Sequence, residues 1–215
     1  VSLFLMFGDS FFKKDDTSPK YKFSKILDFS LYVNLPLLFL LIFFSVYVLS
    51  NHNILSVIDI FKFYFNIDIT LIKEAYTLFD KISIVATTSL FIGTMGTVPG
   101  HELTHRKQNK FDMFIGNWLL ALSWDCAFAI EHVYGHHKNV GLLDDPATAK
   151  RGENIYLFII KAIFNEQKDA WKIEFDHLKR RGYSLFGFRN KMVLGYIRSS
   201  LVTFATYIIG GFMGM

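Results

Sequence analysis

The chain has 215 residues, of which 52% are apolar and 17% aromatic, and its mean hydropathy is +0.30. This composition is apolar for a soluble domain of that size, and uncharged runs long enough to cross a bilayer predict an integral membrane protein. A single cysteine, Cys126, excludes an internal disulfide framework and any cysteine-based zinc or iron–sulfur centre. The net charge of +4 is explained by lysine and arginine gathered in cytoplasmic loops, so no nucleic-acid partner is expected.

The first half of the chain contains two apolar runs that predict a transmembrane hairpin. Residues 29–49 carry no charge, and their length matches the roughly 20 residues needed to cross a bilayer. They follow a lysine-rich stretch, residues 13–25, which we expect in the cytoplasm. Residues 82–98 are also uncharged and return the chain to the cytoplasmic side. Between the two runs, residues 51–81 mix charged and aromatic side chains, which favours an extracytoplasmic loop with an interfacial helix.

The second run leads into a stretch, residues 101–137, that holds five of the seven histidines. They form two clusters, His-Glu-Leu-Thr-His at 101–105 and Glu-His-Val-Tyr-Gly-His-His at 131–137. Histidines four apart in a helix lie on one face, so each cluster can present ligand pairs. Clustered imidazoles indicate a transition-metal site, and this number suits two metals better than one. The expected ligands are His101, His105, His132, His136 and His137.

The sequence identifies the expected ligands more clearly than it identifies the metal. Imidazole without thiolate points to non-haem iron and oxygen chemistry, while zinc and copper stay open. The first cluster also fits the H-E-x-x-H pattern of zinc proteases, in which Glu102 would be the general base. Such a site binds one metal and needs only one further ligand, so it does not account for the three histidines of the second cluster. His52 and His177 stand outside both clusters, and we expect no metal role for them.

The run at residues 111–130 resembles another span, but Asp112 and Asp125 interrupt it. Both histidine clusters must meet around one metal centre, whereas a crossing helix would separate them by about 30 Å. We therefore expect a re-entrant or interfacial helix, with Asp125 as a possible hydrogen-bond acceptor for a ligand histidine.

The last third of the chain predicts one surface helix and one further membrane run. Trp171, Phe175 and Leu178 recur at helical spacing within a densely charged tract, which predicts an amphipathic helix on the cytoplasmic surface. Its basic face suits either an acidic electron carrier or anionic headgroups. Residues 199–215 are uncharged and predict the start of the next hairpin.

The two clusters carry a family resemblance. Residues 101–106 resemble the first histidine box of the integral-membrane alkane hydroxylases and xylene monooxygenases, within the wider membrane fatty-acid desaturase and hydroxylase superfamily. Residues 131–137 resemble their second box, E-H-x-x-G-H-H, at a matching interval, and residues 144–156 resemble the family's continuation. The family usually has lysine where this chain has Arg106.

The same family carries a third histidine box and an H-Y-G-type motif nearer its C-terminus, and this sequence has neither. The chain also starts at Val1 and stops at Met215 inside an apolar run. We therefore expect residues 1–215 to be one incomplete domain of this family, truncated at both ends and inactive as a fragment.

The resemblance implies a fold and a function. It implies an all-α, multi-pass bundle of hairpins in a bacterial inner membrane, with the boxes facing the cytoplasm at the helix ends. It also implies a di-iron oxygenase that hydroxylates an alkane or alkyl chain with O2 and electrons from rubredoxin or a similar donor. Glu102 and Glu131 each adjoin a box histidine, and we expect each carboxylate to accept a ring N–H and fix that ring's tautomer. A desaturase, a membrane zinc protease and a non-catalytic metal-binding membrane protein remain alternatives.

Overall fold

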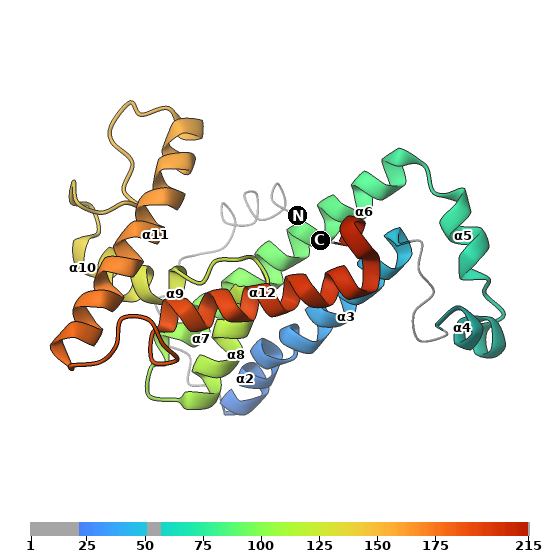
Figure 1. Ribbon diagram of the computed structural model, residues 1–215, viewed down its shortest axis with the longest axis horizontal. Helices are drawn as coiled ribbons and strands as arrows, with labels where there is room; N and C mark the ends of the chain where they lie inside the picture. Colours follow the sequence, from blue (N-terminus) through green and yellow to red (C-terminus); the bar gives the residue numbers. More distant parts are fainter. Residues whose placement is uncertain (1–21, 51–56, 215) are drawn as a thin grey trace. The chain divides into compact units, whose positions relative to one another are not determined.

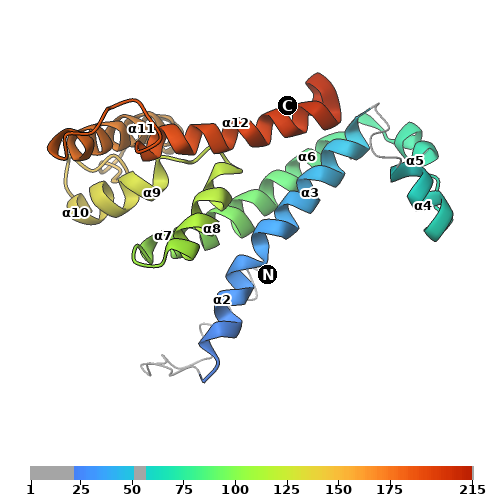
Figure 2. The same cartoon turned by 60° about the horizontal axis from the view of Figure 1, so that its bottom comes forward.

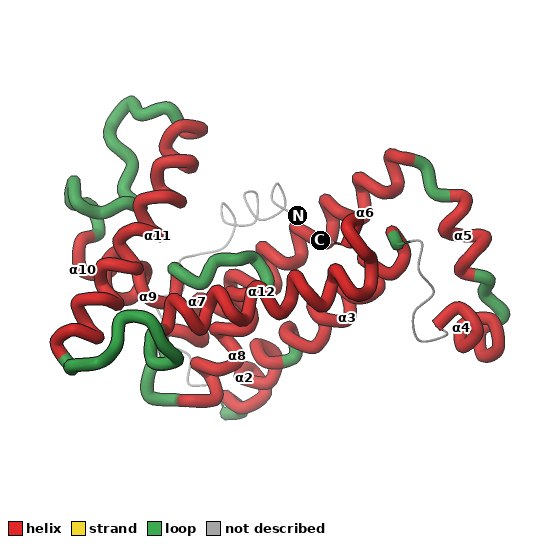
Figure 3. The backbone as a smooth tube through the Cα atoms, viewed as in Figure 1, coloured by secondary structure: helices red, strands yellow, loops and turns green. Residues whose placement is uncertain are grey.

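The computed structural model describes residues 22–50 and 57–214, and all regular structure in these residues is helical (Figure 3). The chain divides into two units, residues 1–30 and 31–215. The second unit contains both histidine clusters, and the packing described below belongs to it. The expectation of an all-α protein is confirmed.

Three helical stretches are long and apolar enough to cross a membrane, namely Ser24–Leu49, Leu78–His105 and Lys191–Gly210. The first consists of α2 (Ser24–Tyr32) and α3 (Asn34–Leu49), and it contains the span expected at 29–49. Pro36 accounts for the break between the two helices, because its ring would clash with the carbonyl of residue 32 in a continuous helix.

The second stretch joins α6 (Leu78–Phe91) and α7 (Val98–His105) through a π-helical segment, Ile92–Thr97. It extends the span expected at 82–98 as far as the first histidine cluster. Pro99 follows the π-helical segment, whose wider turn accommodates a residue that lacks an N–H. The first cluster is therefore the end of a membrane helix.

The third stretch is α12 (Lys191–Gly210), which begins eight residues before the expected start at 199. The uncharged run in the sequence starts only after Arg198, so the expected start of the helix fell too late in the chain. A single arginine does not end a membrane helix, because its long side chain can carry the guanidinium toward the interface.

Within the second unit, α3 lies beside both α6 and α12 (Figures 1 and 2). The Ser45 and Thr88 hydroxyls are 2.8 Å apart and join α3 to α6. Leu38, Leu103 and Leu119 are fully buried in the core between the helices. At one end of this bundle lie α4 (Val57–Phe65) and α5 (Ile69–Ala75), which fit the expected loop with short helices. The expectation for His52 lies outside the described residues.

At the other end, α8 (Lys110–Ala121) packs against α7. Its 12 residues span only about 18 Å, too short to cross, so the expectation of a non-crossing helix at 111–130 is confirmed. A Cβ at Gly116 would lie 3.1 Å from the carbonyl oxygen of Gly100, and a Cβ at Gly100 would lie 3.3 Å from that of Gly116. Two glycines thus let the backbones of α7 and α8 approach closely.

The second cluster follows in three short segments, α9 (Phe128–Glu131), a π-helix (His132–His136) and α10 (His137–Asn139). The chain then forms α11 (Ile155–Arg180), which the side-chain oxygen of Asn154 caps at its N-terminus. Leu178 is fully buried on α11, as the amphipathic pattern predicted. The same inner face also buries Glu174, whose carboxylate accepts a hydrogen bond from the backbone N–H of Lys191 at the start of α12.

Close packing of α12 against the turn before α9 predicts a stability effect. A Cβ at Gly195 would lie 2.3 Å from the Cβ of buried Cys126. We expect Gly195→Ala in the full-length protein to lower stability by about 1–3 kcal/mol, the usual cost of overpacking. Thermal unfolding in detergent measures this. Gly93→Ala is the matched control, because a Cβ there meets nothing within 4 Å.

A second change tests the cause. Cys126→Gly removes the atom that the new methyl group would strike. The double variant should therefore lose less stability than the sum of the two single variants. A Gly195→Ala protein as stable as Gly93→Ala would contradict this packing.

Candidate metal centre

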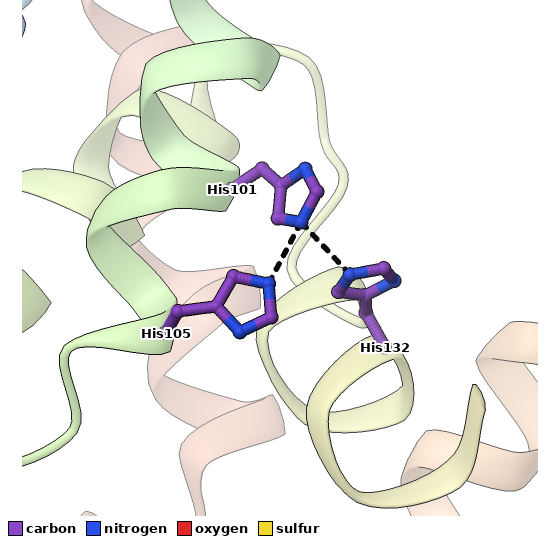
Figure 4. Close-up of side chains that lie close together, drawn as sticks. All are labelled: His101, His105 and His132. Atoms are coloured by element: carbon purple, nitrogen blue, oxygen red, sulfur yellow. Dashed lines mark hydrogen bonds between the residues drawn. The ribbon is translucent and has the colours of Figure 1, made fainter. Parts of the chain in front are cut away.

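Four histidine rings from the two clusters converge where α7 meets the second cluster. The Nε2 atoms of His101 and His105 are 2.8 Å apart, and those of His101 and His132 are 2.9 Å apart (Figure 4). His137 joins them, with its Nε2 3.1 Å from that of His132. The ligand nitrogens of His101, His105 and His132 all lie within 4.8 Å of one another, and His137 adjoins this group through His132.

The spacing of these nitrogens fits a shared metal ion. Imidazole–metal bonds are about 2.1 Å, so two ligands at right angles around an ion place their nitrogens about 3 Å apart. His101, His105 and His132 together form a group with the geometry to hold a metal ion. The donors are all imidazoles, which suits iron, copper or zinc.

The first cluster presents its pair as expected from regular helical spacing. His101 and His105 lie one turn apart on α7, and their ring centroids are 4.7 Å apart. The second cluster instead depends on its π-helix. In that segment the N–H of His137 bonds to the carbonyl of His132, five residues back, so these two rings become neighbours. His137 rather than His136 therefore makes the nitrogen contact with His132.

His136 is held by a carboxylate that the sequence analysis did not assign. Its Nδ1 lies 3.0 and 3.1 Å from the two carboxylate oxygens of Asp145, whose side chain is 0% exposed. The hydroxyl of Thr148 and the N–H of Ala147 donate to the same carboxylate. Burial alone would raise the pKa of Asp145, but the hydrogen bonds from Thr148 and His136 hold it below its usual range.

This contact fixes which nitrogen of His136 is free. An Nδ1–H donated to Asp145 leaves Nε2 as the lone-pair nitrogen, which is the arrangement that a metal-ligating histidine needs. The Asp-Pro-Ala-Thr turn is visible in the sequence as a turn signal. Nothing in the sequence shows which ring the carboxylate reaches.

Glu131 occupies a different place from the one expected. It is 3% exposed, and among the described residues its Oε1 has no hydrogen-bond partner. Burial, followed by repulsion from Glu166, Asp169 and Asp145, raises the pKa of Glu131 to about 7. A Cβ at Gly135 would lie 2.5 Å from Oε1 of Glu131, so the glycine of this cluster makes room for the carboxylate.

Glu102 also lacks the expected bond to a histidine in the described structure. It lies on the outer face of α7 with its side chain 54% exposed, and it accepts hydrogen bonds from Nε and Nη2 of Arg106 at 3.2 and 3.0 Å. Nη1 of Arg106 lies 3.6 Å from buried Asp112 on α8. The arginine at this position thus ties the end of α7 to α8. Burial raises the pKa of Asp125, which lies at the turn before α9 and contacts no histidine among the described residues.

The environment of His132 favours neutral imidazole. Phe128 stacks on His132, with centroids 4.4 Å apart, and meets the edge of His101. Burial, and then the neighbouring histidines, lowers the pKa of His132 to about 4. A neutral ring keeps the lone pair that a metal binds. His177 lies on α11 and is not part of this convergence.

The end of a candidate membrane span and the segment that follows α8 together present a histidine group that could hold a metal ion, in a helical protein with three candidate spans. Residues 82–215 match the model of the family described as fatty acid desaturase, and the chain belongs to this family. The predicted membership of the desaturase and hydroxylase superfamily is confirmed.

The curated relatives agree with this assignment. Alkane 1-monooxygenase 1 of Pseudomonas aeruginosa is 29% identical over 63% of this chain and 35% of its own length. Alkane 1-monooxygenase of Pseudomonas putida is 42% identical over 44% of this chain and 23% of its own. The xylene/toluene monooxygenase hydroxylase component XylM of Pseudomonas putida is 36% identical over 44% and 26%. The chain therefore matches about a third or less of the length of these relatives.

Proposed function

We propose that this chain is part of a membrane-bound non-haem di-iron oxygenase that hydroxylates an alkane or alkyl chain with O2. The observation that carries the proposal is the convergence of the Nε2 atoms of His101, His105, His132 and His137 at spacings of 2.8–3.1 Å. The similarity to alkane 1-monooxygenases supports the substrate class. A fatty-acid desaturase of the same family is the alternative, because both reactions begin with removal of a hydrogen atom from an unactivated carbon.

Some residues of this chain would bind the metal, and others would position the ligands or cover them. Bound iron would supply the activation of O2 that protein side chains cannot perform, with the four converging rings and His136 as its ligands from this chain. Asp145 orients His136 through Nδ1. Phe128 covers the rings on one side with an apolar surface, which suits a hydrocarbon rather than a polar substrate.

The remaining parts of the proposal concern topology and partners. The first histidine cluster lies at the end of a candidate span, where the second cluster meets it, and we place both at the cytoplasmic face because lysines follow the first cluster. The reaction needs two electrons from outside, which rubredoxin or a similar electron-transfer protein would supply in the cytoplasm.

Glu102→Gln in the full-length protein separates the oxygenase from the zinc protease. In the oxygenase, Glu102 is an exposed partner of Arg106, and losing such a pair costs about 0.2–1 kcal/mol. We therefore expect iron content and alkane oxidation within about tenfold of the parent. In a protease the same change removes the general base, a loss of about 10²–10⁴-fold.

The measurements are elemental analysis, O2 consumption with an alkane, and cleavage of an unfolded protein substrate. Glu74→Gln, a change of the same charge in the loop helix α5, is the matched control. Zinc at full occupancy, peptide cleavage that Glu102→Gln abolishes, and no O2 consumption in the parent would overturn the oxygenase proposal.

A further inference from the structure

A basic groove lies beside the second histidine cluster, on the side of Tyr134. Its volume is about 520 Å³, and its lining includes Tyr134, Lys138, Lys179, Arg180 and Lys191. Two acidic residues also line it. Glu174 is buried and accepts from the backbone N–H of Lys191, whereas Asp176 is exposed. Positive side chains therefore dominate the accessible wall of the groove.

The Tyr134 ring contacts one cation of the groove, Lys191, and a second cation beside the groove, Lys107. Nζ of Lys107 lies 4.1 Å from the ring centroid, and Nζ of Lys191 lies 5.7 Å from it. Ammonium groups are attracted to the face of an aromatic ring at these distances. They also repel one another, and with Lys138 and Arg180 nearby they form a site where an anion would relieve the repulsion.

The ends of two spans place this ring at the membrane surface. Lys107 follows the span Leu78–His105 by two residues, and Lys191 is the first residue of the span Lys191–Gly210. Helix ends of this kind lie at the boundary between the hydrocarbon and water. Because both ammonium groups contact one ring, Tyr134 lies at the same depth, where tyrosine is typically enriched.

We propose that this groove binds the phosphate of an anionic phospholipid headgroup. The phosphate would lie between Lys138, Lys179 and Lys191, which all line the groove, with Tyr134 as the floor that holds Lys191 in place. A lipid accounts for the depth of the site, because its phosphate is covalently fixed at the level where the two spans end. A soluble phosphate or an acidic protein shares the charge but has no reason to sit at that level.

The site also has a consequence for the neighbouring histidines. Tyr134 belongs to the π-helix that positions His132 and His137. A lipid bound at Tyr134 would hold this segment against the ends of two spans. The groove would thus anchor the second cluster to the membrane.

The test uses the full-length protein purified in detergent and native mass spectrometry with added lipids. We expect phosphatidylglycerol to be retained in preference to phosphatidylcholine. A lysine near an anionic headgroup is worth about fivefold in affinity, so Lys138→Gln, Lys179→Gln and Lys191→Gln combined should weaken phosphatidylglycerol binding on the order of 100-fold. Tyr134→Leu, which keeps apolar bulk without the aromatic ring, should weaken it about two- to fivefold.

The matched control combines Lys150→Gln, Lys168→Gln and Lys172→Gln, which make the same charge change outside the groove. Its binding of phosphatidylglycerol should stay within about twofold of the parent. If the triple variant does not fold, Lys138→Gln alone should still show about a fivefold loss.

Three results would overturn the proposal. One is equal retention of both lipids, and another is equal loss in the control triple variant. The third is displacement of the lipid by millimolar inorganic phosphate, which would indicate a site for free phosphate. Unchanged lipid retention combined with weaker binding of the acidic electron donor would instead identify a protein-docking surface. Lipid retention is measured without turnover, so its failure would leave the oxygenase proposal untouched.

Discussion

Full-length protein carrying His132→Ala is expected to lose its iron and all measurable alkane oxidation. His132 is the central ring of the convergence, since its Nε2 lies 2.9 Å from that of His101 and 3.1 Å from that of His137. Its removal takes away one ligand and leaves the two clusters without their closest contact. A metal site that loses a ligand at its centre retains little affinity, and activity follows occupancy.

Elemental analysis of the purified variant, together with product formation from an alkane, measures this loss. His101→Ala, His105→Ala, His136→Ala and His137→Ala should behave in the same way, because we assign all five histidines as ligands. His177→Ala is the matched control, and it should keep both iron and turnover, because that ring lies on α11 outside the convergence. Equal damage from His177→Ala would refute this division of the histidines.

Asp145→Ala is expected to lower iron affinity by about 10–100-fold, the usual effect of removing a carboxylate that orients a ligand histidine. The change frees Nδ1 of His136 and removes the acceptor for Thr148 and Ala147, so both the ring and the turn lose their fixed position. Asp145→Asn keeps an acceptor of the same shape without the charge, and it should lose less.

The measurement is the iron retained by the full-length protein at increasing concentrations of a chelator. Asp144→Asn provides the matched control, because this neighbouring aspartate is exposed and makes none of these contacts. Asp145→Ala with the same retention curve as Asp144→Asn would show that the carboxylate does not position a ligand.

The sequence was sufficient for the elements that depend on composition and spacing. Charge-free length predicted the spans, and four-residue spacing predicted that His101 and His105 would face one point. The need for both clusters to reach one metal correctly predicted that residues 111–130 do not cross. These features follow from local pattern, so one sequence contains them.

The carboxylates could not be assigned in this way. Sequence adjacency suggested Glu102 and Glu131 as partners of ligand histidines, but adjacent residues on a helix point about 100° apart. Glu102 therefore faces Arg106, and Glu131 faces Gly135 and α11. The carboxylate that reaches a ring, Asp145, comes from a loop whose path depends on tertiary packing. The start of α12 was misplaced because the position of Arg198 relative to the interface is likewise a tertiary property.

The π-helix at His132–His136 decides which of the two adjacent histidines reaches the other rings. With five residues per hydrogen-bonded turn, His137 faces the other rings while His136 faces Asp145. In a regular α-helix of the same length, His136 would lie four residues after His132 on the same face, and the last two histidines would exchange directions. A substitution that returned this segment to α-helical hydrogen bonding would therefore exchange the roles of two adjacent histidines without altering either of them.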